Sequence, residues 1–177
     1  VFVNSLLNTT DTVGQSSTIT FAEGYYNMSV IAGDTLLNSS KSIVYNFSVN
    51  YAPTIQSARI TPTTAYTNNT LIGYCNATDS TPNTLSYNWR WYNNSIQHSI
   101  GTSTGGNTQG VEFNAINLTS ANTTKGQTWI LSCQANDGNS TSSYINSTGQ
   151  LISNSIPSTP TITQPSSYQN FTSTNVT

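Results

Sequence analysis

Apolar and polar residues alternate in several short segments of this chain, which is the pattern of β-strands that bury one face. No segment sustains the period of a helix. In the central part of the sequence the alternation assigns three sets of residues to the inside: Leu71, Gly73, Cys75 and Ala77; Tyr87, Trp89 and Trp91; and Trp129, Leu131, Cys133 and Ala135. The sequence therefore predicts an all-β protein with a core built from these sets.

The central region is predicted to hold seven short strands, near residues 54–61, 69–78, 85–92, 95–100, 111–118, 127–136 and 143–152. Turn-forming residues separate these segments, for example at 79–82, 101–106 and 136–138. Seven short strands in roughly 100 residues are typical of a β-sandwich.

The chain also repeats itself with an offset of 103 residues. The segment 26–34 aligns with 129–137, and three identical pairs fall within the alignment: Ser29 and Ser132, Ala32 and Ala135, Asp34 and Asp137. Further on, residues 52–55 resemble 159–162 at a slightly longer offset. A period near 100 residues indicates tandem sandwich modules rather than a short solenoid repeat.

The repeat divides the chain into three parts. Residues 1–52 are predicted to be the C-terminal part of one module, 53–156 a complete module, and 157–177 a linker with the first strand or strands of a further module. Together the end pieces lack a stretch equivalent to about residues 71–89. Either the chain is part of a longer tandem array, or the terminal strand of one subunit pairs with residues 1–52 of the next.

Charge is scarce, since only 6% of the residues are charged. The basic residues are Lys41, Arg59, Arg90 and Lys125. Four cations do not neutralise a run of phosphates, so nucleic acid is not an expected partner. No stretch approaches the 18 apolar residues of a membrane span, so none is expected in this segment. Because the first residue is Val1, either a signal peptide has been removed or the sequence is a window on a longer chain.

Asn-x-Ser/Thr sequons are unusually dense. The 23 asparagines and 56 serines and threonines would give roughly 7 sequons by random placement, whereas the chain has 13. They begin at Asn8, Asn27, Asn38, Asn46, Asn68, Asn76, Asn93, Asn117, Asn122, Asn139, Asn146, Asn170 and Asn175. This excess predicts an exported protein that carries covalent N-linked glycans. The alternative is a Ser/Thr/Asn-rich β-protein in which the sequons are incidental.

The strand register predicts where four of these sequons point. In 26–32 and 43–49 the inward residues would be Tyr26, Met28, Val30 and Ala32, and Ile43, Tyr45, Phe47 and Val49. Asn27, Asn46, Asn76 and Asn146 alternate with inward residues, so all four are predicted to face solvent. Desolvation by itself favours outward asparagines, which makes this placement compatible with either interpretation of the sequons.

Three parts of the sequence carry a family resemblance: Cys75, the segment 88–92 (Asn-Trp-Arg-Trp-Tyr) and the segment 129–138 (Trp-Ile-Leu-Ser-Cys-Gln-Ala-Asn-Asp-Gly). On these residues the chain resembles the immunoglobulin-like and PKD-like repeats of large, especially archaeal, surface proteins. The resemblance covers residues 53–156, and it implies tandem immunoglobulin-like β-sandwich modules, one of them complete. Leu131 stands where antibody-type domains have a tyrosine, which argues against antibody-type kinship.

The resemblance also implies specific roles for several residues. Cys75 and Cys133 would form a disulfide between the two sheets, and Trp89 would pack on it. Trp129 and Leu131 would be core residues. Two unrelated buried thiols are the alternative to the disulfide. A metal site is less favoured, because two distant cysteines and a single histidine do not make a ligand set.

Motifs for catalysis are missing, and we expect no enzyme and no cofactor. His98, the only histidine, has no signature around it. Asp79 and Asp137 are weak calcium candidates, because the loops after their strands share one end of an immunoglobulin topology. Support of a turn by the aspartate side chain is the preferred interpretation. Trp91, Tyr92 and Tyr74 are weak candidates for a sugar-stacking surface, with packing as the preferred alternative.

These observations favour a structural component of an extracellular filament, stalk or cell-surface layer. Its partners would be copies of itself or neighbouring modules of a longer chain, joined head to tail, with strand donation as one way to join them. The alternative function is an adhesin-type binding module that recognises a glycan or a surface protein.

Overall fold

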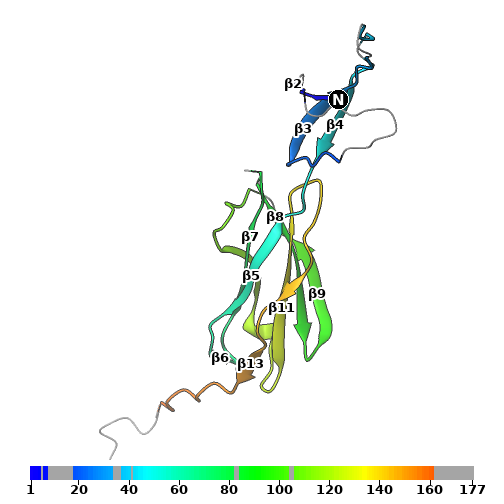
Figure 1. Cartoon of the computed structure of the whole chain (residues 1–177). Helices are drawn as coiled ribbons and strands as arrows, with labels where there is room; N and C mark the ends of the chain where they lie inside the picture. Colours follow the sequence, from blue (N-terminus) through cyan, green and yellow to red (C-terminus); the bar gives the residue numbers. More distant parts are fainter. Residues whose placement is uncertain are drawn as a thin grey trace, which may run out of the picture.

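The protein is described here by a computed structural model that covers residues 1–4, 6–7, 18–33, 37–40, 42–81, 84–103 and 106–161. Two β-structures lie end to end in an elongated molecule, with a four-stranded sheet at the N-terminal end and a two-sheet sandwich below it (Figure 1). The one helix in these ranges is a single 3-10 turn at Ser120–Asn122. The prediction of an all-β fold is confirmed.

One sheet of the sandwich has three antiparallel strands, in the order β10 (Phe113–Leu118), β7 (Leu71–Thr78) and β5 (Thr54–Thr61). The central strand of this sheet, β7, has one face toward the core: every second residue, from Leu71 to Ala77, is buried. The intervening side chains face outward.

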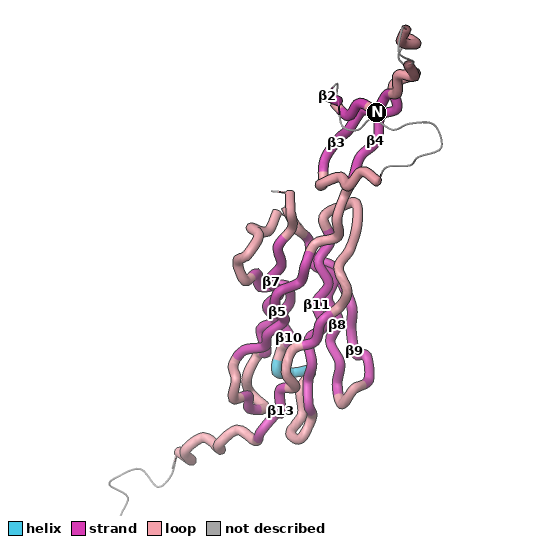
Figure 2. The backbone as a smooth tube through the Cα atoms, viewed as in Figure 1, coloured by secondary structure: helices cyan, strands magenta, loops and turns pink. Residues whose placement is uncertain are grey.

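The second sheet packs against the first (Figure 2). Its order is β6 (Ala65–Tyr66), β13 (Gln150–Ser153), β11 (Thr128–Asn136), β8 (Ser86–Asn93) and β9 (Ile96–Thr102), and β12 (Ile145–Asn146) also pairs with β11. The strands match the predicted ones, with two differences. A short strand β6 was not foreseen, and the last predicted strand is divided into β12 and β13.

Serine hydroxyls account for the interruptions in the last predicted strand. The amide of Ala135 donates to Oγ of Ser142 at 2.9 Å, and the amide of Leu131 donates to Oγ of Ser147 at 3.0 Å. The backbone amides of Ser142 and Ser147 in turn donate to the carbonyl oxygens of Ala135 and Leu131, respectively. A hydroxyl thus takes the place of a backbone carbonyl, so the pairing with β11 is maintained where the strand bulges.

The core lies between the two sheets, and nearly all the residues that the alternation placed inside belong to it. Leu71, Cys75, Ala77, Tyr87, Trp91, Trp129, Leu131, Cys133 and Ala135 are completely shielded from solvent. Cys75 and Cys133 form the disulfide that the resemblance implied, with their Cα atoms 6.0 Å apart. The two sheets are therefore joined covalently at the centre of the core.

Trp89 and Trp91 were both predicted to point inward, and Trp89 is the cross-strand partner of Cys133, but the two tryptophans differ in their burial. Trp91, rather than Trp89, is the completely buried tryptophan of β8, and its ring meets the edge of Trp129 at 6.2 Å between centroids. Trp89 packs against the core but is only partly buried. Its cross-strand neighbour on the edge strand β9 is Gly101, and a side chain there would collide with the Trp89 ring. Because β9 has no outer neighbour, this side of Trp89 stays open to solvent.

The N-terminal sheet consists of β2 (Leu6–Leu7), β1 (Phe2–Val3), β3 (Gly24–Ser29) and β4 (Tyr45–Val49), in that order and antiparallel. The order repeats that of β9, β8, β11 and β13 in the second sheet of the sandwich. Among the described residues no counterpart of the three-stranded sheet lies over it. The N-terminal sheet therefore has the layout of one half of a sandwich.

The hairpin that follows β3 closes in the same way as the one that follows β11. The amide of Ala32 donates to Oγ of Ser39 at 2.9 Å, which is the bond that Ala135 makes with Ser142. Isolated bridges join Gly33 to Asn38 and residue 136 to residue 141. Each of these positions is 103 residues from its counterpart, which is the offset of the sequence repeat.

Candidate assembly surface and module junction

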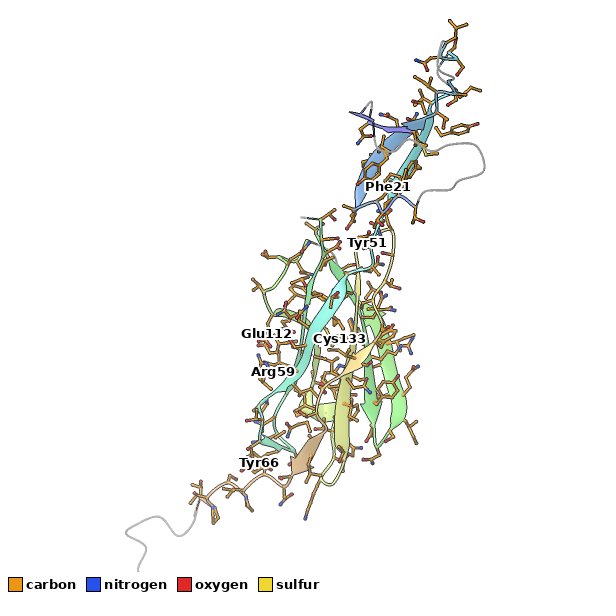
Figure 3. All side chains as sticks on the ribbon, viewed as in Figure 1. Phe21, Tyr51, Arg59, Tyr66, Glu112 and Cys133 are labelled. Atoms are coloured by element: carbon orange, nitrogen blue, oxygen red, sulfur yellow. A yellow bond between two sulfur atoms is a disulfide. The ribbon has the colours of Figure 1, made fainter. Side chains whose placement is uncertain are left out.

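One side of the N-terminal sheet is apolar. Direct pairing places Tyr26 beside Phe47, and Met28 beside both Tyr45 and Val3. Paired residues of neighbouring strands point to the same side, so these residues and Val49 form one surface, which we call the apolar face. Phe21, in the segment before β3, adds to it (Figure 3). Its ring lies 4.9 Å from Tyr26 and 5.0 Å from Phe47, both edge to face.

The apolar face is much less covered than the core of the sandwich. Tyr26, Met28 and Phe47 are only partly buried, whereas the corresponding side of β11 is completely buried. Four residues that were predicted to point inward are exposed: Val30 at 43%, Ile43 at 77%, Tyr45 at 60%, and Ala32. The physical reason is that no second sheet faces this one within the described residues. Exposed apolar surface of this kind is typical of an interaction site.

The opposite side of the N-terminal sheet carries two sequons. Asn27 and Asn46 are direct cross-strand partners, and Tyr25 pairs with Ser48 next to them. We call these four residues the sequon face. Two sequon asparagines therefore lie on one side of the sheet together with the exposed Tyr25, and the aromatic residues Tyr26, Tyr45 and Phe47 lie on the other.

A polar junction joins the sheet to the sandwich. The side-chain amide of Asn50 donates to Oδ2 of Asp137 at 3.0 Å and to Oγ of Ser140 at 2.7 Å. Next along the chain, the hydroxyl of Tyr51 donates to the carbonyl of Phe21 at 2.5 Å (Figure 3). The residues that connect the two parts are thus bonded both to the tip of the sandwich and to the segment before β3.

The carboxylate of Asp137 organises the sandwich side of this junction. Oδ1 accepts from the amides of Asn139 and Ser140, and Oδ2 accepts from the Ser140 hydroxyl and from Asn50. Burial raises the pKa of Asp137, but these hydrogen bonds stabilise the charged form by more, so the pKa lies below its ordinary value. The turn and the junction therefore depend on an ionised Asp137.

A second contact and a cleft complete the junction. Glu23 accepts hydrogen bonds from the hydroxyls of Ser80 and Thr81 in the sandwich. Between the two parts lies an open cleft of about 520 Å³. Its lining comes from both sides: Glu23, Gly24, Tyr25, Ser48, Val49 and Asn50, and Thr81, Thr84, Asp137 and Asn139.

The two calcium candidates support turns. Oδ1 of Asp79 accepts from the amide of Ser80, and the carboxylate of Asp137 accepts from the amides of Asn139 and Ser140 and from the Ser140 hydroxyl. Within the described ranges no three His, Cys, Asp or Glu side chains gather into a group that could hold a metal ion. Turn support, the interpretation preferred from the sequence, describes what both side chains do here.

The ten sequons within the described ranges differ in accessibility. Asn38, Asn46, Asn68, Asn117, Asn122, Asn139 and Asn146 are exposed, whereas Asn27, Asn76 and Asn93 are partly buried. The side-chain oxygens of Asn76 and Asn93 are closed off from solvent and have no hydrogen-bond donor. Asn8, Asn170 and Asn175 lie outside the described residues.

The aromatic set considered for sugar stacking does not form a surface. Trp91 is completely buried, so it is not available to a ligand, and packing, the interpretation preferred from the sequence, describes its role. Tyr74 is occupied by the guanidinium group of Arg59, 4.6 Å from the ring centroid. His98 lies with its ring 4.9 Å from that of Trp129 and covers this part of the core.

Four residues of the two sheet faces and the junction were not predicted from the sequence: Phe21, Tyr25, Asn50 and Tyr51. Tyr51 and Asn50 stand just before Pro53 and the first strand of the sandwich, and this position is the signal that marks a linker. Their partners at positions 21, 137 and 140 are far away in the sequence, and no local pattern indicates them.

No known protein family and no curated protein matches this chain. Among solved structures, the crystal structure of the rat CD45 extracellular region, domains d3–d4, matches with a TM-score of 0.52 and 9% sequence identity. The match covers 79% of this chain and 71% of that one.

The fold is an immunoglobulin-like β-sandwich. What the two chains share is this architecture. In the described part of the chain there is no helix of the length and apolar character that a membrane crossing requires.

Proposed function

We propose that this chain is a structural module of an extracellular, N-glycosylated filament, stalk or surface layer, and that it has no catalytic activity. The observation that carries the proposal is the apolar face of the N-terminal sheet. This sheet has the strand order of half a sandwich, and its aromatic residues Phe21, Tyr26 and Phe47 have no opposing sheet among the described residues. A surface of this kind requires a partner.

The shape of the molecule supports a head-to-tail arrangement. The N-terminal sheet lies at one end, and residues 154–161 leave the sandwich at the opposite end (Figure 1). A contact between the opposite ends of two copies is heterologous, and contacts of this kind build open filaments when they do not close into a ring.

Strand donation is the way in which we propose that the copies join. Residues 159–162 resemble residues 52–55, which lead into β5. In the sandwich β5 packs across the core from β11, and β11 is the counterpart of β3. A segment with the sequence character of β5, supplied by a neighbouring copy, would cover the apolar face of β3 in the same way.

An extracellular location is supported by two features. Structural disulfides such as Cys75–Cys133 are typical of oxidising compartments, and the sequons exceed their chance number. The resemblance to repeats of large surface proteins agrees with this location. Intact mass before and after enzymatic removal of glycans, with peptide mapping, tests the glycosylation. An unmodified protein from the native source would contradict this part of the proposal.

Assembly is tested with a matched pair of variants on the two faces of β4. Phe47→Asp places a charge on the apolar face, whereas Ser48→Asp places the same charge on the opposite face. Ser48→Asp also removes the sequon of Asn46, so Asn46→Gln, which removes this sequon without adding a charge, is a second control. We expect Phe47→Asp to abolish filaments or higher assemblies in electron micrographs and in sedimentation, and Ser48→Asp to leave them intact. Equal assembly by both variants would contradict a role of the apolar face.

Deletion of residues 157–177 tests the manner of joining. If strands are donated, the shortened chain folds, as shown by circular dichroism, but does not assemble. Filaments that survive the deletion would rule out strand donation and would leave a continuous tandem array. The adhesin-type alternative loses Trp91 as a ligand contact, because this residue lies in the core.

A further inference from the structure

The cleft at the junction contains an unexplained combination of residues. Tyr25 is the most exposed large apolar side chain in the described ranges, at 89%, and it lines the cleft from the sheet side. Asn139, which begins a sequon, lines the same cleft from the sandwich side. An aromatic ring and an attachment point for sugar therefore face one space of about 520 Å³, which is within the usual range of ligand pockets, about 300–1,000 Å³.

Asn139 is held in a defined orientation. Its amide donates to Oδ1 of Asp137 at 2.7 Å, so the turn that carries it is fixed. Its side-chain nitrogen lies 3.5 Å from Oδ1 of Asn50, on the other side of the junction. A glycosylated asparagine keeps one hydrogen on this nitrogen, so this contact is compatible with an attached sugar.

The lining of the cleft suits a carbohydrate. Sugars present an apolar face of C–H groups together with hydroxyls, and a tyrosine ring offers a flat apolar surface with a polar end. Around Tyr25, the hydroxyls of Ser48, Thr81 and Thr84 and the carboxylate of Glu23 supply polar groups. Pockets with an aromatic wall and a few polar groups are typical binding sites for small polar ligands.

We propose that the first sugars of an N-linked glycan on Asn139 occupy this cleft, stack on Tyr25 and hold the N-terminal sheet in a fixed orientation relative to the sandwich. This inference rests on the proposed glycosylation. The attachment forms a bond between C1 of the sugar and Nδ2 of Asn139. The bond from C1 to the phosphate of a lipid-linked oligosaccharide breaks, the lipid phosphate leaves, and a proton of Nδ2 passes to a base of the transferase.

Two other sequons flank the same tyrosine. Tyr25, Asn27 and Asn46 line a shallow hollow on the sequon face, so a glycan from that side would also reach the ring. The position of the glycan decides whether it can couple the sheet to the sandwich. A glycan on Asn139 crosses the junction and couples the two parts, whereas one on Asn27 or Asn46 contacts only its own sheet.

The test is a double-mutant cycle in the full-length chain isolated from its glycosylating source. Spin labels at the exposed positions Val44→Cys and Ile96→Cys report the distance between sheet and sandwich. We expect Tyr25→Ala and Asn139→Gln each to broaden the distance distribution, and the double variant to broaden it no further. Asn46→Gln is the control and is expected to leave it narrow. Enzymatic removal of glycans should broaden the distribution in the parent chain and remove the effect of Tyr25→Ala.

Three results would overturn the inference. Tyr25→Ala with the same effect in the presence and absence of glycans would mean that the ring acts without sugar. Broadening by Asn46→Gln and not by Asn139→Gln would mean that the sugar comes from the other sequons. An unmodified Asn139 in peptide mapping, with other sequons occupied, would overturn this site but would leave the proposed function intact. Circular dichroism checks that each variant is folded.

Discussion

Asn50 and Asp137 stand 87 positions apart in the sequence, yet the side-chain amide of one donates to the carboxylate of the other at 3.0 Å. This bond joins the residue that ends the N-terminal part to the turn that follows β11. Asp137 also orders its own turn through the amides of Asn139 and Ser140. One carboxylate thus fixes both the tip of the sandwich and the link to the neighbouring sheet.

The junction is expected to loosen in acid. Because hydrogen bonds hold the pKa of Asp137 below its ordinary value of about 3.9, its contribution to stability is present above that pH and is lost as the pH falls through the lower folded value. Asp137→Asn should loosen the junction at neutral pH and remove this acid dependence. The distance between labels on the two parts, measured against pH, checks both points.

Glu112 provides the comparison for this pH effect. Its two oxygens accept from Arg59 at 2.8 and 2.6 Å, and this hydrogen bonding lowers its pKa also. The pair lies on the outer side of the sandwich and takes no part in the junction. Glu112→Gln should therefore leave the acid-induced loosening unchanged. A junction equally sensitive to both substitutions would show that acid acts on the fold as a whole.

The disulfide is expected to dominate the stability of the sandwich. It closes a loop with a sequence separation of 58, for which the chain-entropy model gives about 4 kcal/mol. Replacement of both Cys75 and Cys133 by alanine should lower the free energy of unfolding by this order of magnitude in denaturant titrations. Because the N-terminal sheet has no cysteine in its described strands, Tyr26 and Phe47 should keep their environment in the variant. If the unfolding midpoints with and without the disulfide coincide, the disulfide does not make the expected contribution to stability.

Ser142, which closes the β11 hairpin, is expected to contribute more to the free energy of unfolding than its neighbour Ser143. Ser142 is buried, and its hydroxyl accepts from the amide of Ala135. Ser142→Ala leaves that amide without a partner, which should cost about 1–3 kcal/mol in the free energy of unfolding. Ser143→Ala, one residue further at an exposed position, is the matched control and should be close to neutral. Equal losses of unfolding free energy in the two variants would mean that the Ser142 hydroxyl does not stabilise the hairpin.

The glycan occupancy of a sequon should depend on how accessible its asparagine side chain is in the folded protein. The side-chain oxygen of Asn76 is closed off from solvent, and its nitrogen donates to the carbonyl of Gly110 at 3.4 Å. Asn146 is exposed on β12. If the transferase meets a folded chain, peptide mapping should find Asn146 modified and Asn76 unmodified. A high occupancy at Asn76 would indicate that sugar is attached before β7 is packed.

Much of the sandwich follows from local patterns in the sequence. Alternation identifies the buried side of β7, β8 and β11, because successive side chains of a strand point to opposite faces and one face of each strand lies against the core. The same logic placed Val30, Ile43 and Tyr45 inside, and they are exposed. The period specifies which residues share a face, but whether that face is covered depends on a second sheet, and local alternation contains no information about that sheet.

The sequence by itself determined the all-β class, the seven main strands, the inward residues of the sandwich and the repeat of 103 residues, because these depend on spacing along one chain. Only the tertiary structure decided that Trp91 is more deeply buried than Trp89, since this depends on the open edge at β9 and on Gly101. It also decided the junction between Asn50 and Asp137 and the cleft shared by Tyr25 and Asn139. These arrangements bring together residues that are distant in sequence, and such contacts are specified by the packing of whole sheets rather than by any local pattern.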